Sequence, residues 1–232
     1  MSRKITRRWF GVSAGAAIAI GVPLRFAKAA EFVFKCGDDL PDTHPMNVRL
    51  AEAAKKISDE THGRFELRLF PSNQLGNDPQ MFSQLRSGAL EIYMGSGSNV
   101  LSTLIPATSV QGLGFIFPDY ATIWRSMDGE LGAYMRAQIN KFGLEVLEKI
   151  WDNGYRHVTT STHPINTPAD MKNLKIRVPV GAVWTTMFKA FGAVPTTINF
   201  NEIYAALQTK IVDAQETPLS LFAAANLFEV QK

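Results

Sequence analysis

The sequence predicts an α/β protein, in which strands and helices alternate along the chain. Residues 31–94 have the order strand, helix, strand, helix, strand, and residues 173–218 show the same order again. Strands that are joined through helices lie parallel to one another, because the helix carries the chain back across the sheet. Two parallel sheets are therefore expected, one from each half of the chain.

The first 29 residues have the features of an export signal and are set apart from the fold. Arg7 and Arg8 form a twin-arginine pattern, an apolar run follows over residues 12–24, and Ala27-Lys28-Ala29 is a typical cleavage site near Ala29. The alternative is an N-terminal membrane anchor. The apolar run is shorter than the roughly 20 residues that cross a bilayer, which favours a cleaved signal.

Removing the leader reverses the net charge. The whole chain has 24 Lys and Arg against 21 Asp and Glu, and six of the basic residues but no acidic one lie in the leader, so 18 remain against 21, or about −3. The pI near 9.0 is therefore a property of the leader. It gives no indication of nucleic-acid binding.

In the first half of the chain, strands are predicted at 31–36, 64–70 and 90–94, and helices from about 43 to 63 and over 81–85. Cys36 is the only cysteine, so no intramolecular disulfide can form, and its position on the same side of the strand as Phe34 predicts a buried thiol. The small polar run at 95–98 follows a strand directly, where its backbone N–H groups can line a crevice.

The middle of the chain is expected to complete this first lobe. Residues 110–120 are rich in Gly, Phe and Pro and predict a packed loop, and 120–142 predict a helix that is interrupted around Gly129. An apolar strand is predicted over 144–151. The crossover follows it, so the first lobe is assigned to residues 30–152 and the second to 153–232.

The second lobe is expected to begin with a strand over 155–160. Leu174, Ile176 and Val178 then alternate with basic residues in a strand that Pro179 closes. A helix ends near Gly192, and a variant of the capping box precedes a second helix, which leads into the strand at 212–218.

In this lobe, the position of Arg177 makes it a candidate for ligand binding. It lies at the carboxyl end of a strand, where α/β folds open their ligand crevice. The alternative is a solvated charge on an alternating strand, and on spacing alone that alternative is the better interpretation.

No motif of catalysis or metal binding is present in the sequence. It contains no Gly-x-Ser-x-Gly elbow, no His-Glu-x-x-His and no Cys/His cluster with zinc spacing, and its four histidines are scattered. No catalytic residue, metal or cofactor is therefore predicted. A periplasmic enzyme stays as the weaker alternative, because catalytic triads need not be local in sequence.

Four consecutive motifs carry a family resemblance: Leu-Lys-Ile-Arg-Val-Pro at 174–179, Gly-Ala-Val-Pro at 192–195, Phe-Asn-Glu-Ile-Tyr-Ala-Ala-Leu-Gln at 200–208 and Val-Asp-Ala-Gln-Glu at 212–216. They resemble the second lobe of the solute-binding proteins of tripartite ATP-independent periplasmic (TRAP) transporters, the DctP family. Shorter matches in the same order extend the resemblance to the first lobe, among them His44-Pro45, Gln74-Leu75-Gly76 and the Trp-x-x-Gly-x-Arg arrangement that ends at Arg156.

The resemblance implies a two-lobe periplasmic binding protein fold with a ligand cleft between the lobes. It implies a periplasmic receptor that captures a small organic acid, a carboxylate, and delivers it to the integral-membrane subunits of a TRAP permease. The twin-arginine export machinery is the further partner that the leader implies, and no nucleic-acid partner is expected.

The resemblance also implies the site. Arg177 is placed as the carboxylate clamp, Arg156 as a second positive contact and Phe200 as an apolar wall, although core packing is the alternative for Phe200. Thr217 stands where many relatives have Asn, and a hydroxyl has fewer donors than an amide. The first-lobe residues expected to face the cleft are Asp39, Asp78 and Ser96.

The chain departs from the family in length. Relatives continue beyond the position of Lys232, so the second lobe is expected to be C-terminally incomplete, and a nonfunctional truncated remnant of a receptor is an alternative reading. Lys210 occupies a position where glycine is usual, at the predicted end of a helix.

Overall fold

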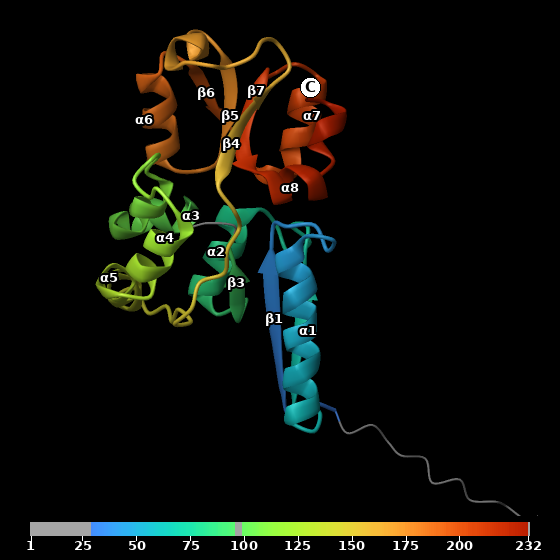
Figure 1. Ribbon diagram of the computed structural model, residues 1–232. Helices are drawn as coiled ribbons and strands as arrows, with labels where there is room; N and C mark the ends of the chain where they lie inside the picture. Colours follow the sequence, from blue (N-terminus) through green and yellow to red (C-terminus); the bar gives the residue numbers. More distant parts are fainter. Residues whose placement is uncertain (1–28, 96–98, 232) are drawn as a thin grey trace, which may run out of the picture.

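The structure is a computed structural model that describes residues 29–95 and 99–231, and its strands form two separate sheets (Figure 1). The first has the strand order β2-β1-β3 and the second the order β4-β7-β5-β6. The predicted leader, except for Ala29, and the predicted site residue Ser96 lie outside the described residues.

The first sheet is parallel throughout, as predicted. Its central strand β1 (Phe32–Asp38) pairs with β2 (Phe65–Phe70) on one side and β3 (Ile92–Met94) on the other. The connections are the helices α1 (Pro45–Glu60) and α2 (Asp78–Ser87), and α1 runs alongside β1 (Figure 1). All three strands therefore end at the same edge.

The two helices begin and end at capping residues. At the start of α1, the Nδ1 atom of His44 accepts a hydrogen bond from the backbone N–H of Met46 at 3.3 Å. Asn77 and Gln80 form a capping box that starts α2, and Gly88 ends it with a φ of 76°. This box explains why α2 is longer than the predicted 81–85.

The second sheet is mixed. Strand β5 (Lys175–Val178) lies parallel to β6 (Val194–Thr197) and to β7 (Ala214–Pro218), as predicted. Strand β4 (Arg156–Thr160) is antiparallel to β7 at the edge of the sheet. Helix α6 (Ala182–Ala190) lies on one side of the sheet, and α7 (Ile203–Gln208) and α8 (Leu219–Ala224) lie on the other (Figure 1).

The segment between the sheets is helical. It contains α3 (Asn99–Leu104), the 3₁₀ helix η1 (Pro106–Gly112), α4 (Tyr120–Met127) and α5 (Glu130–Asn140). The predicted interruption at Gly129 is confirmed, because this residue is the N-cap of α5.

Two predictions for this segment are wrong. Residues 144–151 form no strand: Glu145, Glu148 and Lys149 interrupt the apolar residues, and Leu147 is 82% exposed. The loop at 110–120 is not packed throughout, because Phe115 has a φ of 67° and is 92% exposed. In both cases apolar composition suggested a burial that these side chains do not have.

One core cluster joins the two halves of the chain. Leu40 and Met46, which follow β1, pack with Phe200, Ile203, Leu207, Leu221 and other side chains from the second half. A second cluster, which includes Ile176, Val178, Trp184 and Phe188, fills the space between β5 and α6.

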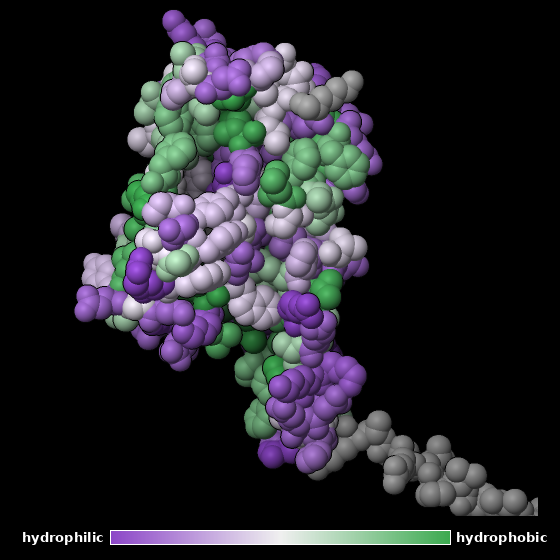
Figure 2. All heavy atoms as spheres, in the orientation of Figure 1, coloured by the Kyte–Doolittle hydropathy of each residue, from purple (hydrophilic) through white to green (hydrophobic). Residues whose placement is uncertain are grey.

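Cys36 is fully buried, as predicted, and burial is the main cause that raises the pKa of its thiol to about 12. In contrast to the buried Cys36, the outer face of α1 is exposed and polar. Figure 2 shows its hydrophilic surface, which has the ion pairs Lys55–Asp59 and Lys56–Glu60. Among the helices of the described residues, none combines the length and apolar character that crossing a bilayer requires.

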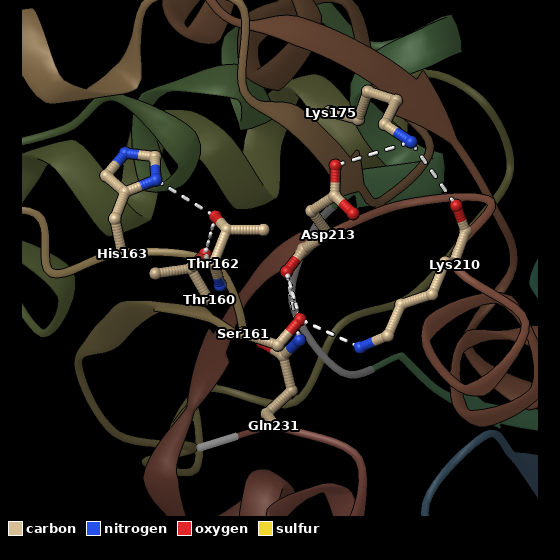
Figure 3. A network of polar contacts seen from close by, with 8 residues as sticks. All are labelled: Thr160, Ser161, Thr162, His163, Lys175, Lys210, Asp213 and Gln231. Atoms are coloured by element: carbon tan, nitrogen blue, oxygen red, sulfur yellow. Dashed lines mark hydrogen bonds and ion pairs between the residues drawn. The ribbon is translucent and has the colours of Figure 1, made fainter.

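A polar network closes the edge of the second sheet where β5 and β7 begin (Figure 3). The Nζ atom of Lys175 lies 3.4 Å from Oδ2 of Asp213 and donates to the carbonyl of Lys210 at 3.3 Å. Lys210 donates in turn to Ser161 Oγ at 3.0 Å and has a φ of 60°, a conformation that favours glycine. This network is structural and lies at the edge away from the carboxyl ends of β5 and β7.

Candidate functional site

The carboxyl ends of the parallel strands in the two sheets border one pocket. Residues that follow β1, β2 and β3 line it from the first half, and residues at or after the ends of β5, β6 and β7 line it from the second. The pocket contains about 320 Å³ of space between atoms, part of it open to solvent. Its lining residues are Asp39, Asp78, Asn99, Arg156, Arg177, Pro179, Val180, Asn199, Phe200, Thr217 and Leu221. Ligands of α/β proteins bind at this edge of a sheet.

Arg156 reaches the same edge from the opposite chain direction. It is the first residue of β4, and because β4 is antiparallel to β7 it lies across from Pro218, the last residue of β7. The start of β4 and the end of β7 therefore both point toward the pocket.

Arg177 lies at the centre of the second sheet and is 3% exposed. Ile176 and Val178, on the opposite face of β5, are fully buried, and Arg177 is buried as well, so the interpretation of Arg177 as a solvated charge is wrong. The Nε atom donates to the carbonyl of Ile198 at 2.9 Å. This bond fixes the orientation of the guanidinium plane.

Burial lowers the pKa of Arg177 to about 10, and the positive charge of Arg156 acts in the same direction. The negative charges of Glu216, Asp39 and Asp78 act against this shift. Arg177 is thus still a cation at neutral pH. It provides a fixed positive charge in a site from which most water is excluded.

Glu216 holds Arg156 in place. The Nε and Nη2 atoms of Arg156 donate to the two carboxylate oxygens of Glu216 at 2.5 and 2.9 Å, and Nη2 also donates to the carbonyl of Glu216 at 3.1 Å. The guanidinium lies 5.8 Å from the centre of the Trp184 ring. Sequence reasoning missed the role of Glu216, although a carboxylate in an otherwise buried strand signals a cationic partner.

The first half of the chain gives the pocket an acidic wall. Asp39 is 3% exposed, and the pKa of Asp78 is raised to about 7, first by burial and then by the charge of Asp39. A hydrogen bond from Tyr93 and the charge of Arg177 act against this shift. Asp38 lies behind the wall, where burial raises its pKa to about 6 although its Oδ1 atom accepts hydrogen bonds from Asn47 and Leu40.

Several buried oxygens of the pocket wall have no hydrogen-bond partner among the described residues. They are Asp78 Oδ1, Asn99 Oδ1 and Thr217 Oγ1. Asn99 is 7% and Thr217 1% exposed. Buried polar groups are rarely left unpaired in folded proteins, so unpaired oxygens in a pocket wall indicate positions for ligand groups.

The structure brings together all of the predicted site residues that it describes: Asp39, Asp78, Arg156, Arg177, Phe200 and Thr217. Phe200 is 8% exposed and belongs both to the pocket wall and to the core cluster around Leu40. The predicted role as an apolar wall and the alternative of core packing are therefore compatible. Sequence reasoning missed Asn99 and Asn199. The feature that could have identified them is their place in the sequence, because each follows the end of a parallel strand.

A group of three or more His, Cys, Asp or Glu side chains able to hold a metal ion is absent from the described residues. The chemistry that these side chains offer is charge complementarity and hydrogen bonding.

Comparison with known proteins gives one consistent result. The model of the family described as bacterial extracellular solute-binding protein, family 7 (DctP) matches residues 36–232. The 2,3-diketo-L-gulonate-binding periplasmic protein YiaO of Escherichia coli is 41% identical over 184 residues, which are 78% of this chain and 56% of YiaO. The C4-dicarboxylate-binding periplasmic protein DctP of Rhodobacter capsulatus is 30% identical over 231 residues, 98% of this chain and 68% of that protein.

Solved structures agree. The TRAP periplasmic solute-binding protein of Sulfurospirillum deleyianum with bound succinate aligns with a TM-score of 0.82 and 32% identity, over 87% of this chain and 64% of that one. The sugar acid binding protein DctPAm of Advenella mimigardefordensis in complex with galactonate aligns with a TM-score of 0.83 and 31% identity, over 88% and 65%. These structures confirm the predicted two-lobe α/β fold class. The chain spans 56%, 43% and 61% of the length of the first three curated relatives that it matches.

Proposed function

Because the chain belongs to family 7 of the bacterial extracellular solute-binding proteins, the DctP family, we propose that it acts as the receptor of a TRAP transporter. It captures a small carboxylate in the pocket around Arg177 and delivers it to the integral-membrane permease subunits. Relatives in this family are solute-binding receptors and not enzymes. The observation that carries the proposal is a buried arginine in a pocket at the carboxyl ends of parallel strands.

Each predicted site residue has a role in this proposal. Arg177 clamps the carboxylate, because its planar guanidinium can donate two parallel hydrogen bonds and keeps its charge when water is excluded. Arg156 adds a second positive charge, Phe200 packs against the carbon skeleton and Thr217 makes a polar contact. On the opposite side, the contacts come from Asp39, Asp78 and Ser96.

The two lobes are proposed to divide at residues 152 and 153, in the segment between α5 and β4 that has neither helix nor strand. Gly154 has a φ of 94°, which gives the chain a sharp change of direction there. Closure of the lobes over a ligand excludes water from the pocket, and opening releases the ligand.

Replacing Arg177 by Ala is expected to abolish carboxylate binding. Removal of one partner from a buried hydrogen-bonded charge pair costs about 2–5 kcal/mol, or about thirty- to several-thousand-fold in affinity. The measurement is thermal unfolding of the protein with a panel of small organic acids, in which a bound acid raises the Tm of the wild type only.

The matched control is Arg49→Ala, which removes the same side chain from an exposed position on α1, where 71% of it is accessible. It should keep the Tm rise of the wild type. An acid that stabilises Arg177→Ala as strongly as the wild type would show that the carboxylate does not bind at Arg177. Recovery of a chemically altered acid would favour a periplasmic enzyme instead.

We also propose that the leader sends the protein to the periplasm through the twin-arginine machinery. Arg7 and Arg8 are the signal that this route reads, so replacing both with Lys should leave unprocessed protein in the cytoplasm. Cell fractionation and the N-terminal sequence of the exported form check this. Unchanged export of the double variant would argue for another route, and cleavage far from Ala29 would place the end of the leader elsewhere.

A further inference from the structure

Trp184, in α6, contacts both halves of the chain. We propose that it is a positioning residue of the receptor: it holds Arg156 in place at the pocket, and it holds the two lobes together when they close on a ligand. This inference rests on the proposed function, in which the lobes close over a carboxylate. It goes further because Trp184 lies outside the residues that line the pocket.

The indole of Trp184 supports one of the two pocket arginines. Trp184 is 3% exposed and belongs to the core cluster between β5 and α6, so the second half of the chain fixes its ring. The Cζ atom of Arg156 lies 5.8 Å from the centre of this ring. A guanidinium at that distance is attracted to the face of the ring, and the attraction is stronger where water is excluded.

Glu216 and Trp184 act on the same guanidinium in different ways. Glu216 accepts hydrogen bonds from Nε and Nη2 of Arg156, and Nη1 takes no part in these bonds. The ring of Trp184 attracts the guanidinium through its charge and not through a particular N–H group. Arg156 is thus held by two partners, while Nη1 stays available to a ligand carboxylate.

The indole also lies against the first half of the chain. The 3₁₀ helix η1 ends at Gly112, which is buried. A Cβ atom at Gly112 would lie 2.5 Å from Cη2 and 2.8 Å from Cζ2 of Trp184, closer than the Cβ atoms of folded proteins approach other groups. The ring therefore occupies the space that any side chain at this position would need, and only glycine permits so close an approach.

Two further glycines extend this contact. A Cβ atom at Gly114 would lie 2.8 Å from Sδ of Met187, which follows Trp184 by three residues and so lies on the same face of α6. A Cβ atom at Gly181, just before α6, would lie 2.9 Å from Cε3 of Trp184 and 3.3 Å from Oγ of Ser102 in α3. This face of α6 therefore packs closely on α3, η1 and the loop that follows η1.

Gly112 and Gly181, one from each half of the chain, thus leave a notch that the indole fills. Because η1 belongs to the first lobe and α6 to the second, opening of the lobes must separate the indole from Gly112. Closure brings the two together again, beside the arginine that faces the ligand. Filling of the notch and binding of a carboxylate therefore stabilise the same closed arrangement, so each favours the other.

The first test replaces the ring. Trp184→Leu and Trp184→Phe are titrated with whichever of three probe acids, succinate, galactonate and glucuronate, the wild type binds most tightly. Calorimetry measures the dissociation constant, and stopped-flow mixing measures the dissociation rate. Leucine has no aromatic face, so Trp184→Leu should bind about tenfold more weakly, through faster dissociation. Phenylalanine keeps an aromatic face and should lose less. The control Trp124→Leu makes the same change in α4 and should leave both constants unchanged.

The second test fills the notch from the other side. Gly112→Ala places a methyl group where the indole lies, so it should weaken binding of the probe acid about tenfold. In the Trp184→Leu background the same change should cost little, because the shorter side chain leaves room, and the two effects should not add. Gly114→Ala is the matched control. Its methyl group meets the flexible end of Met187, which can move aside, so binding should be unchanged.

Tryptophan fluorescence gives a readout that a merely structural role would not change. If closure seats the indole in the notch beside a charged guanidinium, the probe acid should change the emission of the wild type and of Trp124→Leu. This change should be lost in Trp184→Leu.

Two failures are distinguishable. If Trp184→Leu binds the probe acid as tightly as the wild type and releases it as slowly, the role of Trp184 is overturned and the receptor function stands. If none of the three acids binds to the wild type, the proposed function fails, and this inference fails with it. Should Trp184→Leu not fold, unchanged binding in both Trp184→Phe and Gly112→Ala would overturn the inference.

Discussion

The buried charges of the pocket affect one another across the two halves of the chain. Arg177 is 3% exposed, and its positive charge lowers the pKa of Asp78 while the charge of Asp39 raises it. The outcome for Asp78 is a pKa of about 7, because burial is the largest of these effects. Its ionisation should therefore change the stability of the protein near neutral pH.

Replacing Asp78 by Asn is expected to stabilise the protein more at pH 8 than at pH 5. The folded-state pKa of about 7 lies above the ordinary value of 3.8, so the folded protein holds this proton more tightly than the unfolded chain does. Between these two values the stability of the wild type falls as pH rises, and an amide does not titrate. The measurement is the difference in Tm between variant and wild type at several pH values.

The lowered pKa of His44 works in the opposite direction, since a buried neutral histidine costs stability when it must be protonated at low pH. His44 is present in both proteins, so its effect cancels in the difference. A Tm difference that stays constant from pH 5 to pH 8 would mean that Asp78 titrates in the ordinary range.

Individual site residues were predicted from the family resemblance, because spacing alone favoured a solvated charge at Arg177. Arg177, Thr217 and Asp39 lie at or just after the ends of strands in the structure. The pairing of Arg156 with Glu216 was not predictable, because the two are 60 residues apart and meet only through the antiparallel register of β4 on β7.

Among the secondary-structure elements, α2 shows how a helix end is fixed by one residue. Gly88 follows the helix with a φ of 76°, and its backbone N–H donates to carbonyls of the last turn. No heavy atom lies within 4 Å of the position that a Cβ atom would occupy there. The requirement for glycine is therefore purely one of backbone conformation.

Replacing Gly88 by Ala is expected to lower the free energy of unfolding by about 1 kcal/mol, because an L side chain disfavours left-handed backbone. Chemical denaturation measures the loss. Gly88→Asn should cost less, since asparagine tolerates this conformation better. Equal losses for Ala and Asn would point to a cause other than backbone strain.

Elements with a clear period or a terminating residue were predictable, and runs of apolar composition without one were not. Strand β2 alternates from Phe65 to Leu69, and the break between α4 and α5 lies at a glycine. Residues 144–151 mix apolar side chains with Glu145, Glu148 and Lys149, and they form no strand. Whether an extended segment pairs depends on its partners, which the local sequence does not describe.

For the molecule as a whole, the contacts between the two halves include apolar packing. Leu40 is fully buried and belongs to the same cluster as Phe200, Ile203 and Leu221, which lie more than 150 residues away in the sequence. The loop after β1 therefore contributes to both the acidic wall and the shared core. The order of strands predicted two sheets, but nothing in the sequence predicted this cluster, because it depends on long-range packing.

Replacing Leu40 by Ala is expected to destabilise the protein by about 2–5 kcal/mol, the usual cost of truncating a fully buried leucine. Urea unfolding followed by circular dichroism and by tryptophan fluorescence should show one coincident transition in the wild type and a lower midpoint in the variant. Leu113→Ala, at a side chain that is 48% exposed, is the control and should change stability by less than about 0.5 kcal/mol. A cost at Leu40 as small as this would show that the two halves do not depend on the shared cluster.

The buried thiol of Cys36 has a practical consequence for following ligand capture in solution. It is the only cysteine of the chain, it is fully buried and its pKa is raised to about 12, so reagents that modify thiolates should leave it untouched in the folded protein. A new cysteine at an exposed position such as Phe115 can then be coupled to a fluorescent dye without first removing the native one. The native protein is in this sense ready to carry a dye that reports on the proposed capture of a carboxylate.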